Sequence, residues 1–471
     1  MAELYELTAR EQRDLVLTRE VSAIELLEAH LAHIDAVNPA LNAIVTLVPE
    51  HARDQARQVD EKLAAGDDPG ILAGLPVAHK DLTLTRGIRT TFGSRLYADF
   101  IPDQSDLIVD RLNSAGAVTI GKTNTPEWGA GSQTFNDVFG ATRNPWDTSK
   151  TCGGSSGGAA VALAARMLPI ADGSDMGGSL RNPASFCHVV GFRVSSGRIP
   201  TSVAQMAWSS LSVLGPMARN VEDCALMLAA IAGPDDRSPI TLSDPGTTFL
   251  ASLDQDPAGT RVAIAPDFGG QLPVDGAVQQ VVKSTVPLLH SLGCQVSEGC
   301  PDFRGADEAF KTLRAWSFAA SHGENIKRSA NLFKETIIWN VEQGLKLSGS
   351  DIARAEILRT RVMNRVINFM GDHDFLILPV AQVPPFSVET EYVTDIAGTS
   401  METYIDWMKS CYYITVTGLP AISLPCGFTG EGLPVGIQIV GRPRGDLELL
   451  KFARAVERAL DVDRIKPPII T

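Results

Sequence analysis

The chain has 471 residues, of which 44% are hydrophobic and 20% are charged. This balance is typical of a globular protein with a large core, and it excludes the disordered and fibrous classes. The formal net charge of -14 argues against a nucleic-acid partner, because binding to a polyphosphate needs a basic surface. No stretch resembles a flexible linker, so we expect a single domain over residues 1–471.

The N-terminal residues and the cysteines bear on location and redox state. The segment from Met1 to Glu6 is acidic and lacks the basic and apolar regions of a secretory signal. No apolar run reaches the length of a membrane span, so we expect no membrane contact and a cytoplasmic protein. Seven widely spread cysteines without a C-x-x-C pair predict reduced, mostly buried thiols and no metal site. Cys152 and Cys187 lie nearest the motifs described below, but the serine signal there is stronger.

The first part of the chain predicts helices. Residues 8–37 carry apolar side chains at helical spacing, with Thr8 and Ser22 as candidate caps, until the Asn38–Pro39 pair interrupts the pattern. A further helix is expected near residues 50–65. These helices are expected to contribute packing rather than chemistry.

Strands and helices alternate in the next segment. A buried strand is expected over 72–78, and it leads directly into Lys80. A helix over 106–115 then precedes a strand over 117–120, which is followed by a glycine-rich stretch over 129–158. A basic side chain is therefore expected at the end of a buried strand.

The alternation continues through the rest of the chain. A helix over 159–167 is followed by a strand over 169–171 and a second glycine-rich turn over 172–181. Further strands are expected over 261–264, 375–378 and 435–440. This order predicts an α/β fold with a large mixed, mainly parallel β-sheet covered by helices on both faces. Residues 303–370 are mainly helical, and we expect them to form a lobe over the active site.

Residues 116–123, GAVTIGKT, match the Walker A pattern of nucleotide-binding loops. That motif requires a flexible loop whose amides hold phosphate, whereas the four residues between these glycines are an apolar, strand-like run. Pro126 also falls where the following helix would make its first turns. We therefore interpret the segment as a turn, a strand and a turn rather than as a nucleotide site.

Residues 153–157, GGSSG, match G-x-S-x-G, the nucleophile elbow of α/β-hydrolases. An elbow follows an apolar strand, and the preceding residues 145–150 do not form one. A Ser-His-Asp triad nevertheless stays open as an alternative mechanism, because four histidines lie downstream, at His188, His290, His322 and His373.

A third constellation combines Lys80, Ser155 and Ser179. A lysine acts as a general base only when it is neutral, and the apolar strand before Lys80 offers the burial that lowers a lysine pKa. A hydroxyl between lysine and nucleophile can relay the proton, and glycines on both sides of the Ser155–Ser156 pair permit an unusual backbone there. Ser179 follows a Met176-Gly177-Gly178 turn, whose consecutive amides suit the stabilisation of an oxyanion. Each motif is ambiguous alone, but together they favour a serine hydrolase.

These motifs form part of a longer pattern that resembles the amidase-signature family. The core of the match runs over 153–158 and 173–192. Supporting matches lie at 76–81, 121–128, 140–147, 215–219, 418–421 and 433–438. The resemblance covers most of the chain and weakens between roughly residues 240 and 400.

The resemblance implies a Ser-cisSer-Lys triad. In such a triad Ser179 attacks the carbonyl, Ser155, entered through a cis peptide bond, passes on its proton, and Lys80 accepts it. By the same analogy the oxyanion hole consists of the amides of Met176, Gly177, Gly178 and Ser179. The residues implied to hold the surrounding loops are Ser156, Ser174, Asp175 and Arg181.

The sequence departs from the commonest family pattern at Met176, at Asn182 and over Ser195–Arg198. None of these departures removes a catalytic group. They leave the subfamily open, and with it the substrate.

We predict an amide-bond hydrolase that works through a seryl acyl-enzyme and needs neither a metal nor an organic cofactor. Small or aryl amides are the first candidates as substrates, and esters and carbamates (urethanes) follow. Five side chains are candidates for an apolar pocket, although each also fits a core position: Trp128, Phe135, Phe139, Met206 and Trp208. The resemblance keeps open a different role, as the glutaminase subunit of a tRNA-dependent amidotransferase. Whether the chain forms a homo-oligomer is also left open.

Overall fold

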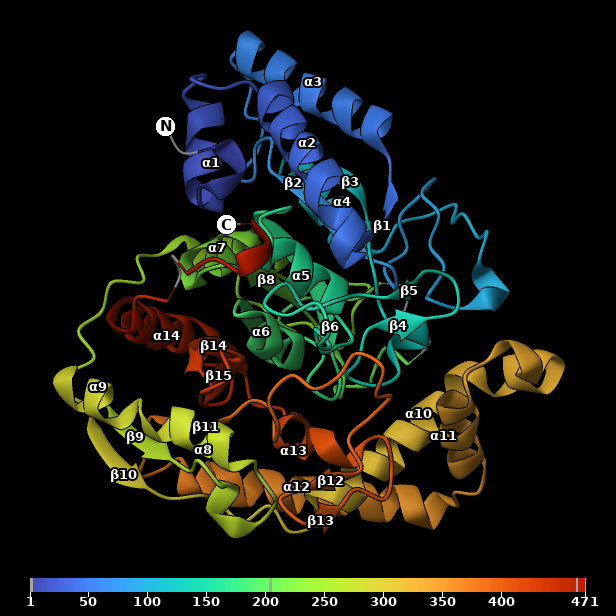
Figure 1. Cartoon of the computed structure of the whole chain (residues 1–471), viewed down its shortest axis with the longest axis vertical. Coiled ribbons are helices and arrows are strands. Elements are labelled where there is room, and N and C mark those ends of the chain that lie inside the picture. Colours follow the sequence, from blue (N-terminus) through green and yellow to red (C-terminus); the bar gives the residue numbers. More distant parts are fainter. Residues whose placement is uncertain (1–2, 203–205, 463–464, 471) are drawn as a thin grey trace.

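The computed structural model describes residues 3–202, 206–462 and 465–470. Its strands form two main sheets (Figure 1). The strands of the larger sheet are β6 (Ile170–Asp175), β7 (Val190–Arg193), β8 (Val213–Ala218), β9 (Arg261–Ile264), β10 (Gln295–Glu298), β11 (Phe375–Pro379), β14 (Ala421–Phe428) and β15 (Pro434–Val440). They lie side by side in the order β10-β9-β11-β15-β14-β7-β8-β6.

The predicted mixed α/β sheet is confirmed, but the balance of its strand pairs differs from the expectation. β9 runs parallel to β10 and β11, whereas the other neighbouring pairs in the described sheet are antiparallel. The sheet is therefore mixed without being mainly parallel. One reason for the antiparallel pairs is the hairpin formed by β14 and β15. The short turn over 429–433 joins these two strands, and so short a connection is available only to antiparallel strands.

Helices cover both faces of this sheet, as predicted. On one face α5 (Gly157–Ala164) packs against α6 (Arg181–Cys187), and a Cβ at Gly436 of β15 would lie 2.9 Å from the Ser185 hydroxyl of α6. Val440 lies four residues after Gly436 in β15 and therefore faces the same side of the sheet. Leu376 of β11 pairs with Val440, so it faces that side too. The preceding residue, Phe375, points to the other face, where its ring stacks on Phe452 of α14 (Asp446–Leu460) at 4.3 Å. A further helix, α7 (Val221–Ile231), packs beside α14.

The smaller sheet carries Lys80. It consists of β1 (Ile44–Leu47), β3 (Val118–Thr123) and β2 (Pro76–Lys80), in the order β1-β3-β2. β2 packs against β6 of the larger sheet. The strand that ends at Lys80 thus lies beside the strand that leads toward Ser179.

The segment that matches the Walker A pattern is a turn, a strand and a turn, as interpreted from the sequence. Every residue of β3 is buried, and Lys122 donates a hydrogen bond from Nζ to Thr85 Oγ1 at 2.9 Å. A Cβ at Gly121 would lie 1.9 Å from the carbonyl oxygen of Thr46 in β1. This glycine is therefore required for the close approach of two strands.

The first predicted helix is wrong in its bounds, because it consists of α1 (Ala9–Leu17) and α2 (Ala23–Leu41). Thr8 and Ser22 each form a capping box with the glutamate three residues later, so each starts its own helix. α2 also continues past Pro39, which lies in its last turn. The proline removes one N–H donor from this turn, and the helix ends two residues later at Leu41.

Two strand boundaries also differ from the expectation. β2 begins at Pro76 rather than at residue 72, because the preceding residues form turns in which the Leu75 amide donates to the Leu72 carbonyl at 3.0 Å. β6 continues to Asp175, beyond the predicted end at residue 171, because it pairs with β8 along its whole length. The polar residues of β6 therefore enter the sheet.

Residues 303–370 are mainly helical, as predicted. They contain α10 (Ala306–Ser329), α11 (Glu335–Leu345) and α12 (Gly349–Phe369), and α10 packs against both others and against α13 (Lys409–Thr417). The remaining α-helices and strands are α3 (Pro49–Ala65), α4 (Leu107–Ser114), α8 (Gly276–Lys283), α9 (Val286–Ser291), β4 (Phe135–Asn136), β5 (Gly140–Ala141), β12 (Asp395–Ile396) and β13 (Thr399–Ser400). Among the described helices, none combines the length and the apolarity needed to cross a bilayer.

The close contact between β1 and β3 generates a stability prediction. Replacing Gly121 with alanine forces the two strands apart, so we expect Gly121→Ala to lower the free energy of unfolding by about 2 kcal/mol or more. Gly276→Ala is the matched control, because a Cβ there meets no atom within 4 Å. Urea unfolding followed by circular dichroism measures both variants. Equal stability of the two variants would show that β1 and β3 tolerate the added methyl group.

Candidate active site

Lys80 ends β2 in the middle of a cluster of hydroxyl groups. Its side chain is 1% exposed. The Nζ atom lies 2.8 Å from Ser155 Oγ, 3.0 Å from Ser156 Oγ and 3.0 Å from Ser174 Oγ. The fold thus brings together one lysine and three serines that the sequence places in three separate motifs.

The surroundings of Lys80 favour its neutral form. Burial lowers the pKa of Lys80 to about 7, although the carboxylates of Asp172 and Asp175 act in the opposite direction. A lysine amine with such a pKa has a free lone pair in a large fraction of molecules near neutral pH. The arrangement can therefore accept a proton from a neighbouring hydroxyl.

Ser155 follows a cis peptide bond from Gly154, as the resemblance implied. The backbone of the 129–133 loop lies against this turn. A Cβ at Gly129 would lie 3.3 Å from Ser155 Oγ, and one at Gly154 would lie 2.9 Å from the Gln133 nitrogen. These glycines leave room for a tightly folded turn around the serine.

Ser179 lies in the turn over residues 176–179 that connects β6 to α6. It is 8% exposed, and its carbonyl oxygen accepts a hydrogen bond from the Ser156 amide at 3.1 Å. This bond joins the Ser179 turn to the Ser155 turn. Within the described residues no hydrogen bond links the Ser155 and Ser179 hydroxyls directly, and such bonds commonly tighten only when substrate is bound.

The amides of the 176–179 turn differ in what they contact. The Gly178 amide donates to Asp175 Oδ1 at 3.0 Å, so it is engaged within the protein. The amides of Met176, Gly177 and Ser179 have no acceptor among the described residues. Three of the four amides implied by the resemblance are therefore available to an oxyanion, and the Gly178 amide holds the turn instead.

Asp175 and Arg181 form a buried ion pair beneath this turn. Arg181 donates from Nη2 and Nε to the two Asp175 oxygens at 2.9 and 3.0 Å, and Arg193 lies 3.2 Å away from the same carboxylate. Burial raises the pKa of the Asp175 carboxyl, but the charges of Arg181 and Arg193 outweigh this effect and hold the pKa below its usual range. Arg181 also donates to groups of the C-terminal region: the Cys411 carbonyl, Gln438 Oε1 and Thr415 Oγ1, each at 3.0 Å.

Several residues of this site were not anticipated from the sequence. Asp172, two residues before Ser174 in β6, accepts from His79 Nδ1 at 2.9 Å and from the Lys80 amide at 3.3 Å. Asn182, at a position where the family more often has an apolar residue, accepts from the Gly154 amide at 3.2 Å. The only sequence signal was the polar character of these residues inside otherwise apolar motifs.

The alternative Ser-His-Asp triad finds no support in the structure. No described histidine donates to or accepts from the hydroxyl of Ser155, Ser156 or Ser179. The buried histidine nearest the cluster, His79, contacts Asp172 with one ring nitrogen and Thr119 Oγ1 with the other, at 3.2 Å. The elbow-like motif therefore supplies Ser155 to a lysine rather than to a histidine.

The cysteines are free thiols, and all except Cys300 are buried, as predicted. Burial raises the pKa of Cys152 to about 12, and it raises the pKa of Cys187 well above its ordinary value. Thiols with such pKa values carry almost no thiolate and are poor nucleophiles. In the described part of the chain, no group of three or more His, Cys, Asp and Glu residues is arranged to hold a metal ion.

The five candidate pocket residues lie in different places. Trp128 precedes Gly129 and stacks on Phe92 at 4.5 Å, and Phe135 lies beneath the Lys334 ammonium at 4.0 Å. Phe139 lies beneath Arg89, 5.0 Å from the guanidinium carbon. Met206 and Trp208 border residues outside the described part of the chain, and Trp208 is 78% exposed. Trp128 packs against the cluster that contains Ala130 of the loop beside Ser155, and Phe135 lines a small cavity together with Gly131 and Gln133 of the same loop.

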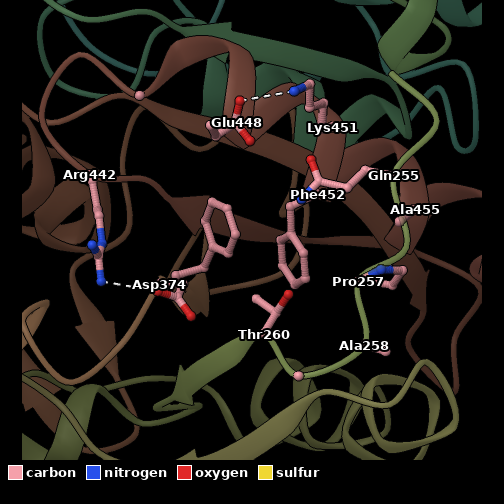
Figure 2. Close-up of a pocket in the computed structure, with 13 residues that line it drawn as sticks. Gln255, Pro257, Ala258, Thr260, Asp374, Arg442, Glu448, Lys451, Phe452 and Ala455 are labelled. Carbon is pink, nitrogen blue, oxygen red and sulfur yellow. Dashed lines mark hydrogen bonds and ion pairs between the residues drawn. The ribbon is translucent and has the colours of Figure 1, made fainter. Parts of the chain in front are cut away.

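A separate pocket of about 560 Å³ opens between β11, α14 and the segment over 255–260 (Figure 2). The stacked rings of Phe375 and Phe452 form part of its wall. Its charged side chains pair with one another, as Arg442 with Asp374 and Glu448 with Lys451. Neither Lys80 nor any of the clustered serines lines this pocket, so it is not the site of the chemistry described above.

Comparison with known proteins places this geometry in context. The family model described as Amidase matches residues 25–450. The acylamidase of Rhodococcus erythropolis is 35% identical over 461 residues, which cover 96% of this chain and 95% of that protein. A glutamyl-tRNA(Gln) amidotransferase subunit from Trichormus variabilis is 33% identical over 488 residues, which cover 98% of this chain and 99% of that protein.

Solved structures agree with the sequence relatives. A bacterial aryl acylamidase of the amidase signature family has a TM-score of 0.92 and 26% identity, covering 99% of this chain and 100% of its own. The 6-aminohexanoate cyclic dimer hydrolase has a TM-score of 0.90 and 28% identity, with both chains fully covered. The chain therefore belongs to the amidase family and is an amide-bond hydrolase.

Proposed function

We propose that the protein hydrolyses small or aryl amides through an acyl-enzyme on Ser179, with Ser155 as proton bridge and Lys80 as base. The observation that carries this proposal is the 2.8 Å contact between the buried Lys80 amine and Ser155 Oγ. The similarity to an acylamidase and to an aryl acylamidase supports the choice of substrate class. Esters and carbamates fit the same scheme, because their carbonyl groups accept the same nucleophile.

The proposed reaction has two steps. In the first, Ser179 Oγ bonds to the carbonyl carbon, its proton passes to Ser155, and the Ser155 proton passes to neutral Lys80. The free amides of Met176, Gly177 and Ser179 stabilise the oxyanion, and the proton returns to the leaving nitrogen as the C–N bond breaks. In the second, water attacks the acyl-enzyme and uses the same relay, which frees the carboxylic acid and Ser179.

Three contacts of Lys80 are compatible with this role. A neutral amine has two N–H donors and one lone pair, so of its three hydroxyl neighbours it donates to two and accepts from one. In our proposal Ser156 and Ser174 take the donated bonds, whereas Ser155 donates its proton to the lone pair. Ser156 and Ser174 thus orient the amine.

We further propose that the chain is one domain in which helix α10 forms a lobe over the 176–179 turn. A Cβ at Gly177 would lie 3.2 Å from the Phe310 ring of α10, and Arg314 of the same helix contacts Met176. Trp128 precedes Gly129 in the loop beside Ser155, its ring lies 4.6 Å from that of His322 in α10, and it is the strongest of the candidate pocket residues. Substrate would then bind beside this contact between α10 and the 128–133 loop.

The relatives also favour a second candidate function. The glutamyl-tRNA(Gln) amidotransferase subunits match the whole chain at an identity close to that of the acylamidase. In that role the site would release ammonia from glutamine and would work with a partner subunit. Hydrolysis of 4-nitroacetanilide by the purified single chain supports the amidase role, whereas activity confined to glutamine in the presence of other subunits would overturn it.

The proposed triad predicts a pattern of inactive variants. We expect Ser179→Ala and Lys80→Met each to lower kcat/KM for 4-nitroacetanilide by about 10³-fold or more, because each removes a group of the relay. Ser284→Ala and Lys283→Met, two exposed positions at the end of α8, are the matched controls and should keep full activity. Thermal unfolding verifies that each variant is folded. Near-normal turnover by a folded Ser179→Ala protein would contradict the assignment.

The base assignment predicts the direction of the pH dependence. Lys80 accepts a proton only when neutral, and burial lowers its pKa to about 7. We therefore expect kcat/KM to rise by about tenfold per pH unit below this value and to level off above it. Initial rates with a neutral anilide, measured from about pH 5.5 to 9, test this. A profile that is flat across pH 7, or one that falls there, is inconsistent with Lys80 as the base.

A further inference from the structure

Arg314 of α10 is a buried cation that has no counter-ion among the residues that the structure describes. It is 4% exposed, and in the described part of the chain no carboxylate lies within ion-pair distance of its guanidinium. Its hydrogen-bond partners are all neutral: Asn340 Oδ1 at 3.1 Å, Tyr404 Oη at 2.9 Å and Met176 Sδ at 3.6 Å. The other buried arginines near the 176–179 turn, Arg181 and Arg193, both contact Asp175.

These neutral contacts compensate the charge only in part. A charge removed from water is unfavourable unless it meets an opposite charge or a full set of hydrogen bonds. The Phe318 ring lies 4.2 Å from the Arg314 guanidinium carbon and contributes a cation–π contact. A guanidinium has five N–H donors, however, and the contacts to Asn340, Tyr404 and Met176 use only three of them. The remaining donors and the positive charge suit an anion that comes from outside the chain.

The position of Arg314 connects this charge to the catalytic turn. Met176, which its guanidinium contacts, is the first residue of the turn that ends at Ser179. Tyr404, its second partner, lies against Gly131 in the loop beside Ser155. Arg314 therefore lies between the two loops that border the proposed substrate site.

Two further polar atoms in this region have no partner. Trp128 Nε1 and His322 Nδ1 are buried, and neither has a hydrogen bond to a described residue. Their rings lie 4.6 Å apart, and His322, about two turns along α10 from Arg314, is 8% exposed. Burial, and then the charge of Arg314, lower the pKa of His322 to about 4, so its ring is neutral near pH 7. Two ring nitrogens that lack a described hydrogen-bond partner, Trp128 Nε1 and His322 Nδ1, thus lie on the same side of the site as Arg314.

We propose that Arg314 is a specificity-determining residue that selects amides carrying a carboxylate a few bonds from the scissile carbonyl. This inference rests on the proposed function, because it assigns a substrate class to the same site. The formal net charge of the chain is -14, so its overall field repels anionic substrates. Selection of such a substrate therefore requires a local cation, and Arg314, whose guanidinium contacts Met176 of the turn that ends at Ser179, supplies it.

The experiment compares matched pairs of anilides that differ only in charge. Succinanilate and butyranilide have a carboxylate or a methyl group at the end of the same acyl chain. 4-Acetamidobenzoate and 4-methylacetanilide place the same difference on the amine side. We expect the wild-type enzyme to favour the charged member of at least one pair in kcat/KM, by about 30-fold or more. Arg314→Met should abolish this preference, because it lowers kcat/KM for the charged member of the pair far more than for the neutral member.

The control is Arg328→Met, which removes the same charge from an exposed position in the last turn of α10. It should keep the preference, and the preference should persist in high salt, which screens long-range attraction. If Arg314→Met does not fold, the ratios of kcat/KM for the charged and the neutral member of each pair still test the proposal. They are then measured for the wild-type enzyme and for Arg314→Lys, which keeps the charge.

The outcomes separate the two proposals. Ser179-dependent hydrolysis of the neutral anilides without a preference for either carboxylate would overturn the role of Arg314 and leave the proposed function intact. An equal loss for charged and neutral substrates in Arg314→Met would also overturn it, because that result indicates a purely structural role. Failure of the wild-type enzyme to hydrolyse any of the four anilides refutes the proposed function itself.

Discussion

The burial of one lysine at the junction of two sheets is the constraint on which the rest of the site depends. Lys80 is kept from water by β2 of the smaller sheet and β6 of the larger sheet, and three hydroxyls are the polar groups within reach of its amine. Desolvation is what lowers its pKa toward neutrality. The strands must therefore meet closely enough to exclude solvent, and the glycine-rich turns after them must bring Ser155 and Ser179 to the same place.

Buried charges hold these turns in position. Asp175 engages the Gly178 amide and the Arg181 guanidinium, and Arg181 extends to α13 and β15. Arg181, two residues after the proposed nucleophile, is thus fixed by segments more than 200 positions away in the chain. Breaking one member of such a network leaves the others buried without partners, which is strongly unfavourable. The same network leaves three amides of the turn free, because it consumes only that of Gly178.

The proposed catalytic residues and the proposed specificity residue come from different segments of the chain. The lysine and serine motifs lie within residues 76–192, whereas α10 begins at Ala306. Acylamidases, a cyclic dimer hydrolase and amidotransferase subunits all share the fold. A common fold with different substrates implies that specificity comes from the side chains around a shared centre. Arg314, which α10 places beside Met176, is such a side chain.

The sequence by itself determined the parts that local rules govern. Glycine spacing and the long joint pattern singled out Lys80, Ser155 and Ser179 as candidates, and the apolar run around residues 117–120 showed that the Walker-like segment is a strand. Only the tertiary structure decided which strands pair, which face each helix covers, and that Asp172 and Arg314 lie beside the site. Periodicity reports that a residue is buried, but not what it is buried against, because its partners come from distant segments. For the same reason the absence of a counter-ion beside Arg314 became visible only when the carboxylates of the described residues had positions in space.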